Sequence, residues 1–148
     1  MSINTLQQLY KKHLTQLKTE IAAYTKEEHM WIVQGNITNS GGNLCLHLIG
    51  NLKAFIGAQI GKTGYVRDRT FEFSGKNVPR EELIQQIEET MTIVEKSLSL
   101  VDEDMLQSDY PLVIFKEKMT YEFFLIHLVS HLTYHLGQIN YHRRLLDM

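Results

Sequence analysis

Apolar residues recur at steps of three and four in four separate stretches of this chain, and this periodicity constrains its fold more than any other feature. The stretches span residues 3–24, 43–60, 79–100 and 121–145. Such a repeat places the apolar side chains along one face of a helix. The chain contains two prolines, so each helix can continue for several turns. Four amphipathic helices with two long connections in one domain predict an all-α fold of the four-helix-bundle type.

Local signals mark the boundaries of these helices. Hydroxyl or amide side chains precede three of them and are expected to cap them: Ser2 or Asn4, Asn39 or Ser40, and Thr120. Gly50 and Gly57 lie inside the second helix and indicate the close approach of a neighbouring helix. A long connection runs from Gly61 to Val78, and the apolar run from Tyr110 to Phe115 predicts a short extended segment, such as a small strand.

Length, charge and cysteine content narrow the class of protein. A chain of 148 residues fits a single domain over residues 1–148, and 43% apolar with 22% charged residues is typical of a globular domain. A net charge of −2 argues against electrostatically driven binding to nucleic acid. The single cysteine, Cys45, excludes an internal disulfide and a zinc site built from several cysteines.

The sequence contains no recognisable targeting or membrane-spanning segment. The N-terminus lacks a basic stretch followed by an apolar one. No window reaches the ~18 uninterrupted apolar residues of a membrane span. We therefore expect a soluble, cytoplasmic protein without a membrane partner.

Four histidines in the last helix give the strongest chemical signal. His127, His131 and His135 are four residues apart, and each step of four turns the helix by about 40° net. His142 lies about 60° from His127, so all four fall within an arc of ~80° that borders the apolar face. Imidazole is a common ligand for zinc, nickel, copper and iron, and histidines at i and i+4 can hold one ion from one helix face.

A catalytic zinc ion takes three protein ligands and one open position, so a further ligand has to come from another helix. His47 is the candidate, because it borders the apolar stripe of the second helix. Cys45 lies ~200° away around that helix and cannot join His47 on one ion. On spacing alone, a histidine-rich face that is simply solvated is equally consistent with the pattern. His13 and His29 are isolated and are expected at the surface.

Other helical metal chemistries lack their motifs in this chain. Di-iron carboxylate bundles use Glu-x-x-His on two helices, and no histidine here follows an acidic residue by three positions. The His-Glu-x-x-His pattern of helical metalloproteases is also absent.

Three stretches carry a resemblance to known proteins. The last helix contains His131-Leu132-Thr133-Tyr134-His135-Leu136-Gly137-Gln138-Ile139, the second helix contains Leu46-His47-Leu48-Ile49-Gly50-Asn51-Leu52, and the connection contains Arg67-Asp68-Arg69 followed by Glu72-Phe73. The first resembles the His-x-x-x-His-x-Gly-Gln signature of the DinB-like (damage-inducible) superfamily, and the second is similar to that family's first metal-ligand segment. The third resembles a stretch found in one subgroup of uncharacterised bacterial members. The likeness covers nearly the whole chain.

The resemblance implies a four-helix bundle with up-up-down-down order and a long crossover connection. It also implies a divalent metal ion, zinc or nickel, held by His47, His131 and His135. Dimers are common in the family, so a homodimer is expected. Some relatives are transferases or isomerases that use a low-molecular-weight thiol together with a metal.

The same motif assigns roles to neighbouring residues. Its register selects His135 rather than His127 as a ligand, so His127 is expected to border the site as a candidate group for proton transfer. Gln138 is expected to orient a ligand or the substrate, although an ordinary interhelical hydrogen bond would explain it equally well. Arg67 and Arg69 are expected to pair with acidic neighbours rather than to bind an anionic substrate.

These features predict a metal-binding protein that acts as a metal-dependent thiol S-transferase or hydrolase on an external thiol or water. Its partners would be a small-molecule substrate or thiol cosubstrate and a second copy of the chain. Two alternatives are a non-catalytic metal-binding or stress-response dimer and a purely structural dimerisation domain. Bound metal separates the last of these from the others, and a deep pocket with the metal at its floor separates the first from the second.

Overall fold

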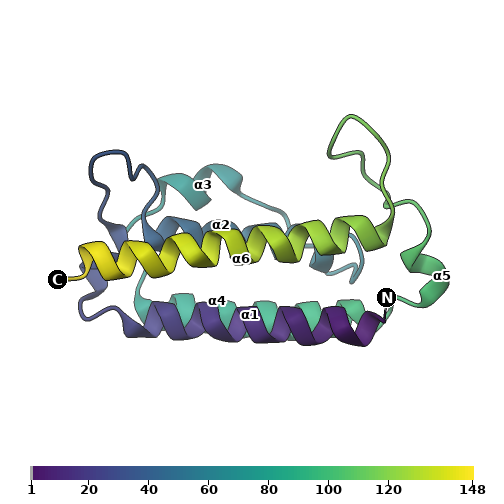
Figure 1. Cartoon of the computed structure of the whole chain (residues 1–148), viewed down its shortest axis with the longest axis horizontal. Helices are drawn as coiled ribbons and strands as arrows, with labels where there is room; N and C mark the ends of the chain where they lie inside the picture. Colours follow the sequence, from purple (N-terminus) through teal and green to yellow (C-terminus); the bar gives the residue numbers. More distant parts are fainter. Residues whose placement is uncertain (1) are drawn as a thin grey trace.

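Every named element of the computed structural model, which describes residues 2–148, is a helix (Figure 1). The predicted all-α class is therefore confirmed. The elements in chain order are α1 (Ile3–Ala23), the 3₁₀-helix η1 (Glu27–Trp31), α2 (Gly41–Leu52), the π-helix η2 (Lys53–Ala58), α3 (Arg69–Ser74), α4 (Arg80–Leu98), α5 (Glu103–Leu106) and α6 (Tyr121–Leu146).

The expected caps are present at three helix starts. The side-chain oxygens of Ser2, Ser40 and Thr120 each accept a hydrogen bond from a backbone N–H two or three residues further on, at the starts of α1, α2 and α6. Of the two pairs of alternatives, Ser2 and Ser40 are thus the capping residues. Asp68 caps the short helix α3 in the same way.

The second predicted helix changes geometry halfway along its length. α2 passes directly into η2, where the N–H of Gln59 bonds to the carbonyl of Ala54, five residues back. The carbonyl oxygen of Phe55 instead accepts a hydrogen bond from the Tyr110 hydroxyl at 2.5 Å. The helical run covers residues 41–58, close to the predicted 43–60, but a regular α-helix over that whole range is wrong.

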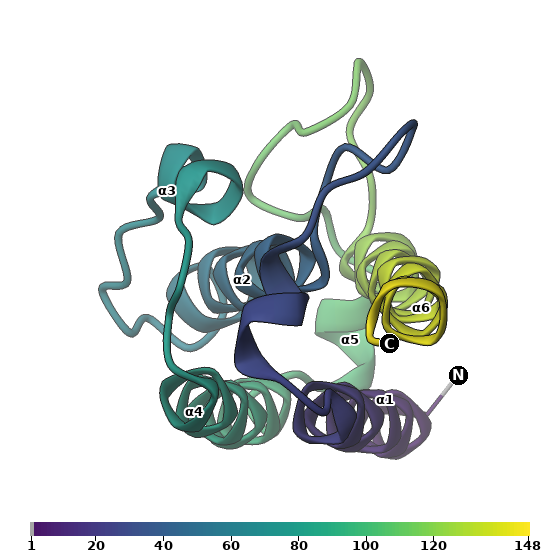
Figure 2. The same cartoon turned by 90° about the vertical axis from the view of Figure 1, so that its left-hand side faces the viewer.

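The first and last long helices lie side by side and run in the same direction (Figures 1 and 2). Near their starts, the Tyr10 hydroxyl donates to the carbonyl of Leu125. Near their ends, Arg143 Nε donates to a carboxylate oxygen of Glu20 at 2.8 Å. The start of α1 therefore contacts the start of α6, and the end of α1 contacts the end of α6, so the two helices are parallel.

α4 forms a second parallel pair with α2 and its continuation η2. Lys53 Nζ donates to Glu89 Oε2 at 3.3 Å, and a Cβ atom placed on Gly57 would come within 2.8 Å of the Ile93 side chain. Gly57 thus allows the close helix approach that its position in the sequence indicates. Both contacts join residues 36 positions apart in sequence (89 − 53 and 93 − 57), so the two helices keep one register.

The helix directions differ from the up-up-down-down order that the resemblance implies. Arg80, at the start of α4, donates to the carbonyl of Tyr24, just past the end of α1, so these two helices are antiparallel. In chain order α1, α2, α4 and α6 run up, down, down, up, and the expected order is wrong. The reason lies in the connections, because residues 59–79 return along the molecule before α4 begins (Figure 1). The expected long crossover is present.

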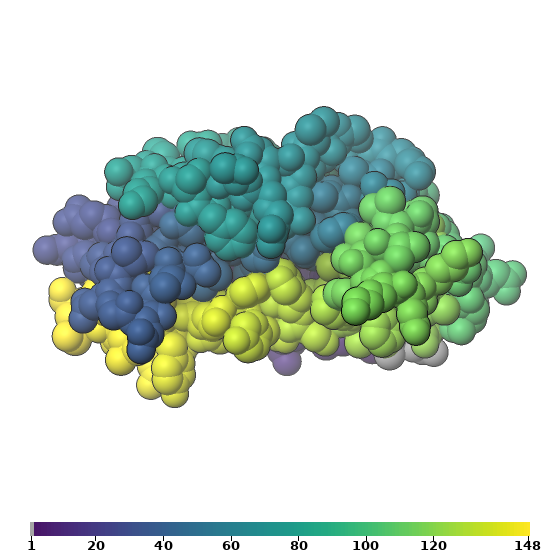
Figure 3. Space-filling view, turned by 90° about the horizontal axis from the view of Figure 1, so that it is seen from above, coloured from purple at the N-terminus to yellow at the C-terminus, as the bar shows by residue number. Residues whose placement is uncertain are grey.

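The predicted extended segment over residues 110–115 is wrong. These residues belong to a projecting, largely exposed loop, and the nearest extended pairing is a single bridge between Asp109 and Thr120. The loop, α3 and the connection before α2 lie on the same face of the molecule, over α2 and α6 (Figure 3). That face carries the histidines.

The apolar stripes that predict the helices form the core. On α1 the buried side chains are Leu6, Tyr10, Leu14, Leu17 and Ile21. α2 is buried along its whole length, which matches its high apolar content. Within residues 2–148, no helix combines the length and apolarity that crossing a bilayer requires.

Candidate metal centre

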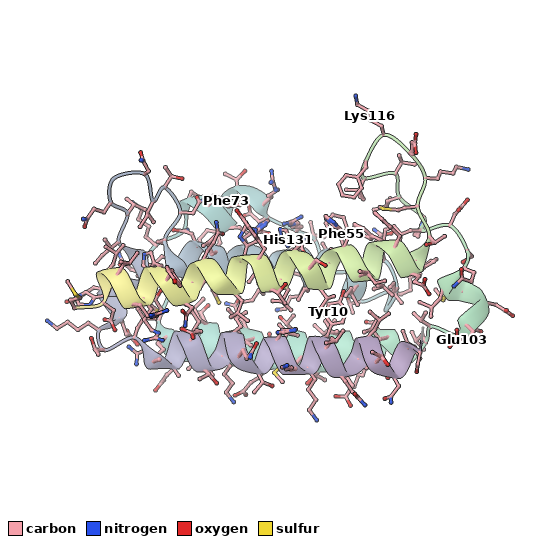
Figure 4. The ribbon with its side chains drawn as sticks, viewed as in Figure 1. Tyr10, Phe55, Phe73, Glu103, Lys116 and His131 are labelled. Carbon is pink, nitrogen blue, oxygen red and sulfur yellow. The ribbon has the colours of Figure 1, made fainter. Side chains whose placement is uncertain are left out.

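His47, His131 and His135 converge in the structure as the sequence predicts. His47 is buried on α2, and the other two are half-buried on α6 at i and i+4. Figure 4 labels His131 on α6. His131 Nε2 lies 3.1 Å from His47 Nε2 and 3.1 Å from His135 Nε2. Each of the three residues offers one ligand atom within 4.8 Å of the others.

The donor set fits a divalent ion. Two nitrogens on one tetrahedral zinc lie about 3.3 Å apart when each zinc–nitrogen bond is about 2.0–2.1 Å. The 3.1 Å separations at His131 are close to this value, so little movement is required. Three imidazoles also suit zinc or nickel better than magnesium or calcium, which prefer oxygen ligands.

Hydrogen bonds at the far nitrogens orient two of the three rings. His47 Nδ1 donates to Glu72 Oε1 at 3.0 Å, and His135 Nδ1 donates to Gln138 Oε1 at 2.7 Å. A proton on Nδ1 leaves the Nε2 lone pair free to bind a metal. Among the described residues His131 Nδ1 is buried and has no hydrogen-bond partner, so packing alone orients that ring.

Glu72 is a buried carboxylate with a second strong partner. Arg67 donates to both of its oxygens at 2.9 Å, which is a bidentate pair. Burial raises the pKa of Glu72, but the hydrogen bonds from His47 and Arg67 outweigh burial and hold the pKa below its usual value. The carboxylate therefore stays charged. The expectation that Arg67 pairs with an acidic neighbour is confirmed.

The short helix α3 carries Glu72 and is fixed against α2. The Asn43 amide donates to the carbonyls of Glu72 and Gly75 at 3.0 and 2.7 Å. The Phe73 ring packs on the His47 ring with a centroid distance of 4.9 Å. A Cβ atom at Gly50 would come within 1.9 Å of Glu72 Oε2, so only glycine leaves room for the carboxylate.

The site favours neutral imidazoles. Burial first, and then the neighbouring His135, His47, His127 and Arg67, lower the pKa of His131 from 6.5 to about 4. Burial also lowers the pKa of His135, and the hydrogen bond that its Nδ1 donates to Gln138 only partly offsets the effect of burial. Because only a neutral imidazole can ligate, these two rings need not lose a proton at neutral pH to bind a metal.

His127 borders the three-histidine cluster without joining it. Its ring centroid lies 6.4 Å from that of His131, one helical turn away. Phe115 packs edge-on against it at 5.0 Å, and Phe124 stacks at 6.0 Å. This position agrees with the register of the motif, which selects His135 as the ligand.

The remaining histidines serve other parts of the fold. His142 shares the helix face but lies at the far end of α6, buried between the Tyr24 hydroxyl and the carbonyl of Ile32. His29 is not a simple surface residue, because its Nδ1 lies 2.7 Å from Asp147 Oδ1 and only 14% of its side chain is exposed. Its position in the short helix η1, against the C-terminal end of α6, is not visible in any periodicity. His13 is partly exposed and bonds to Gln16 on its own helix.

Cys45 is fully buried and stands apart from the site. Burial raises the pKa of its thiol well above the ordinary value, so the reactive thiolate does not form at neutral pH. This agrees with the expectation that any nucleophile is external to the chain.

Three residues at this centre do not follow from helical spacing: Asn43, Glu72 and Phe73. Glu72 and Phe73 lie in the connection, where no periodicity indicates which helix they contact. The resemblance marks Glu72 and Phe73 without placing them, and Gly50 is the signal for where they pack, because a glycine in mid-helix three residues after His47 indicates a close contact there.

A pocket of about 320 Å³ lies beside the centre. Its walls include Thr38 and Asn39 from the connection before α2, and Gln138 and Tyr141 from α6. Gln138 therefore contacts both the His135 ring and this pocket. The lining is uncharged and mixes amide and hydroxyl groups with apolar surface.

Comparison with known proteins finds one family whose members resemble this chain over its described length. A search of curated proteins finds no match to this chain. The sequence profile of one protein family matches residues 2–148, which is the whole of the described chain. The chain therefore belongs to the family described as protein of unknown function DUF1572.

Proposed function

We propose that this chain is a DinB-like four-helix-bundle protein that binds a divalent metal ion through His47, His131 and His135. The observation that carries the proposal is the convergence of three Nε2 atoms from two helices, with 3.1 Å separations at His131. The long crossover and the His-x-x-x-His-x-Gly-Gln run on the last long helix support the DinB-like assignment.

The reaction that we propose is either transfer of an electrophilic group to an external thiol or hydrolysis of a substrate by water. A zinc or nickel ion with an open position supplies Lewis acidity, which lowers the pKa of a thiol or water that it binds. The one cysteine of the chain, Cys45, is fully buried and is not available as a thiol nucleophile. A thiol that takes part in the reaction would therefore come from solution.

The chain's own residues would position the substrate and move a proton. Gln138 uses its carbonyl oxygen on His135, which leaves its amide N–H groups as donors for a group held in the adjoining pocket. His127 is the nearest further imidazole, and its position one turn from His131 suits proton transfer to or from a substrate. The Phe115 and Phe124 rings pack on His127 and shield part of it from water.

One observation favours a second candidate function, a metal-binding protein without turnover. Four surface pockets in the described part of the chain are lined without any of the three histidines. A catalytic ion is expected at the floor of a substrate pocket. The 320 Å³ pocket reaches the centre only through Gln138, so the two functions need a direct test.

The test begins with metal content. Protein purified without a histidine tag or a chelating column should contain close to one zinc or nickel per chain by elemental analysis. His131→Ala should lose that metal, because His131 Nε2 takes part in both 3.1 Å contacts, one with His47 and one with His135. His13→Ala removes an imidazole outside the site and serves as the control. Undiminished metal in His131→Ala would contradict the proposed site.

The second stage is a screen of low-molecular-weight thiols with electrophiles, and of hydrolase substrates. Turnover that disappears with the metal and weakens in His127→Ala supports the enzyme. If the metal is bound and no substrate turns over, the non-catalytic function becomes the better proposal.

A further inference from the structure

The crossover connection lies against the metal centre through one buried charged group. Glu72 is 4% exposed, and its carboxylate contacts His47 from α2 and Arg67 from the crossover itself. The backbone at Gly50 closes the third side, so the carboxylate cannot shift toward α2. Buried polar groups are normally hydrogen-bonded, and this carboxylate meets that requirement with partners from both the crossover and the metal centre.

The geometry assigns a definite task to this carboxylate. His47 Nδ1 has two neighbours, Glu72 Oε1 at 3.0 Å and an Arg67 amino nitrogen at 3.4 Å. Arginine cannot accept a hydrogen bond, so only Glu72 can receive a proton from Nδ1. The bond to Glu72 therefore keeps the proton on Nδ1 and turns the bare Nε2 toward His131, 3.1 Å away.

The rest of the crossover holds Glu72 in this position. The Asn43 side chain holds residues 72–75 against α2, because its amide donates to the carbonyls of Glu72 and Gly75. Phe73 lies on the face of the His47 ring. A change in the orientation of His47 would thus disturb α3, and a change in α3 would disturb His47.

We propose that Glu72 is a positioning residue for the metal centre, and that binding of the metal and docking of residues 67–75 onto α2 are thermodynamically coupled. This inference rests on the proposed three-histidine site. Metal binding pulls His47 Nε2 toward the ion and strengthens the Nδ1–H bond to Glu72, because the ion makes the ring a better donor. In turn, a docked Glu72 prepares His47 for the ion, since linkage between two equilibria is reciprocal.

The test compares zinc affinity in two matched variants. Glu72→Gln removes the charge with almost no change in shape. Glu20→Gln does the same to the Glu20–Arg143 pair, which has one bond of 2.8 Å and lies outside the centre. Competition with a chromophoric zinc chelator should show a loss of about 10–100-fold for Glu72→Gln and none for Glu20→Gln. Urea unfolding of both zinc-free variants shows whether they are folded to the same degree.

A second measurement needs no variant. Hydrogen exchange of residues 67–75 should slow when zinc is added to the wild-type chain, and the zinc effect should be much smaller in Glu72→Gln. The Co²⁺-substituted protein adds a spectroscopic check, because a reoriented His47 changes the d–d absorption bands.

The outcomes separate this inference from the proposed function. If the wild-type chain binds no zinc, the three-histidine site itself fails and the coupling fails with it. If the wild-type chain binds zinc, and Glu72→Gln binds it equally tightly or residues 67–75 exchange at an unchanged rate, the coupling alone is overturned. An equal loss in Glu20→Gln would assign the effect to general destabilisation and would also overturn it.

Discussion

At the scale of single residues, the ionisation of His131 sets a pH dependence for the whole chain. The pKa of His131 falls from 6.5 to about 4 on folding, so between these values the unfolded chain binds the proton more readily than the folded one. The zinc-free protein should therefore lose stability as the pH falls from about 6.5 to about 4, and it should gain nothing from His131 above that range. Chemical denaturation at a series of pH values measures this.

His131→Gln is the variant that isolates this effect. Its stability should fall less steeply over the same pH window, because one group with a depressed pKa is gone. The slope should not vanish, since burial also lowers the pKa of His135 and His142. A slope identical to that of the wild-type chain would contradict the depressed pKa of His131.

Two glycines in helices that form the centre should respond oppositely to alanine. At Gly50 a Cβ atom would lie 1.9 Å from Glu72 Oε2, so Gly50→Ala must displace a carboxylate that Arg67 and His47 hold. Overpacking of this kind costs about 1–3 kcal/mol, and zinc affinity should fall as well. At Gly137 no atom lies within 4 Å, so Gly137→Ala should add about 0.5–1 kcal/mol of helix stability. Urea unfolding of the pair would contradict this explanation if both variants shifted the same way.

The residues of the centre differ in how far the sequence predicts them. His131 and His135 repeat at the period of a helix, so their common face follows from elementary geometry. His47 follows from its position on a second apolar stripe together with the resemblance. Glu72 acts through a bond between a connection and a helix, and no local pattern encodes a contact across 25 positions.

At the scale of secondary-structure elements, His142 joins the end of α6 to the segment that follows α1. Its Nε2 donates to the carbonyl of Ile32 at 2.8 Å, so its Nδ1 accepts from the Tyr24 hydroxyl at 2.8 Å. Tyr24→Phe leaves that buried nitrogen without a partner and should cost about 1–3 kcal/mol. Calorimetry or urea unfolding measures the loss.

Tyr134→Phe is the matched control for this prediction, because Tyr134 lies on the same helix as His142 and is 67% exposed. It should leave stability nearly unchanged. Equal stabilities for Tyr24→Phe and the wild-type chain would show that the bond between Tyr24 and His142 contributes nothing to the fold.

The elements also show where sequence patterns lose their power. The extents of the four long helices follow from apolar spacing and from caps such as Ser40 and Thr120. The directions in which these helices run depend on whether the connection between two of them turns back or runs the length of the molecule. Connections of both kinds have similar composition, so the sequence does not distinguish them. In the π-helical stretch, the carbonyl of Phe55 accepts a hydrogen bond from the Tyr110 hydroxyl of a distant loop, and no local signal predicts this contact.

At the scale of the whole molecule, the exposed apolar loop should mediate self-association. Val113 and Ile114 are 58% and 38% exposed on the projecting loop, and Phe123 beside it is 58% exposed. Contiguous apolar surface of this kind marks an interaction site more often than scattered residues do. Light scattering at high micromolar concentration should therefore show a homodimer.

A double substitution, Val113→Asp with Ile114→Asp, should shift the chain to a monomer. Val66→Asp provides the control, since Val66 is 87% exposed but lies on the crossover. If the wild-type chain is monomeric under these conditions, or if the double substitution leaves the dimer intact, this loop is not the interface.

The parallel contact between α1 and α6 has a consequence for biosynthesis. Tyr10 and Glu20, near the beginning of the chain, find their partners Leu125 and Arg143 only near its end. On the ribosome, the side of α1 that faces α6 therefore stays uncovered while more than a hundred further residues are translated, although α4 can pack on α1 earlier. The core cannot be completed, and the two imidazoles on α6 cannot meet His47, until α6 has left the exit tunnel.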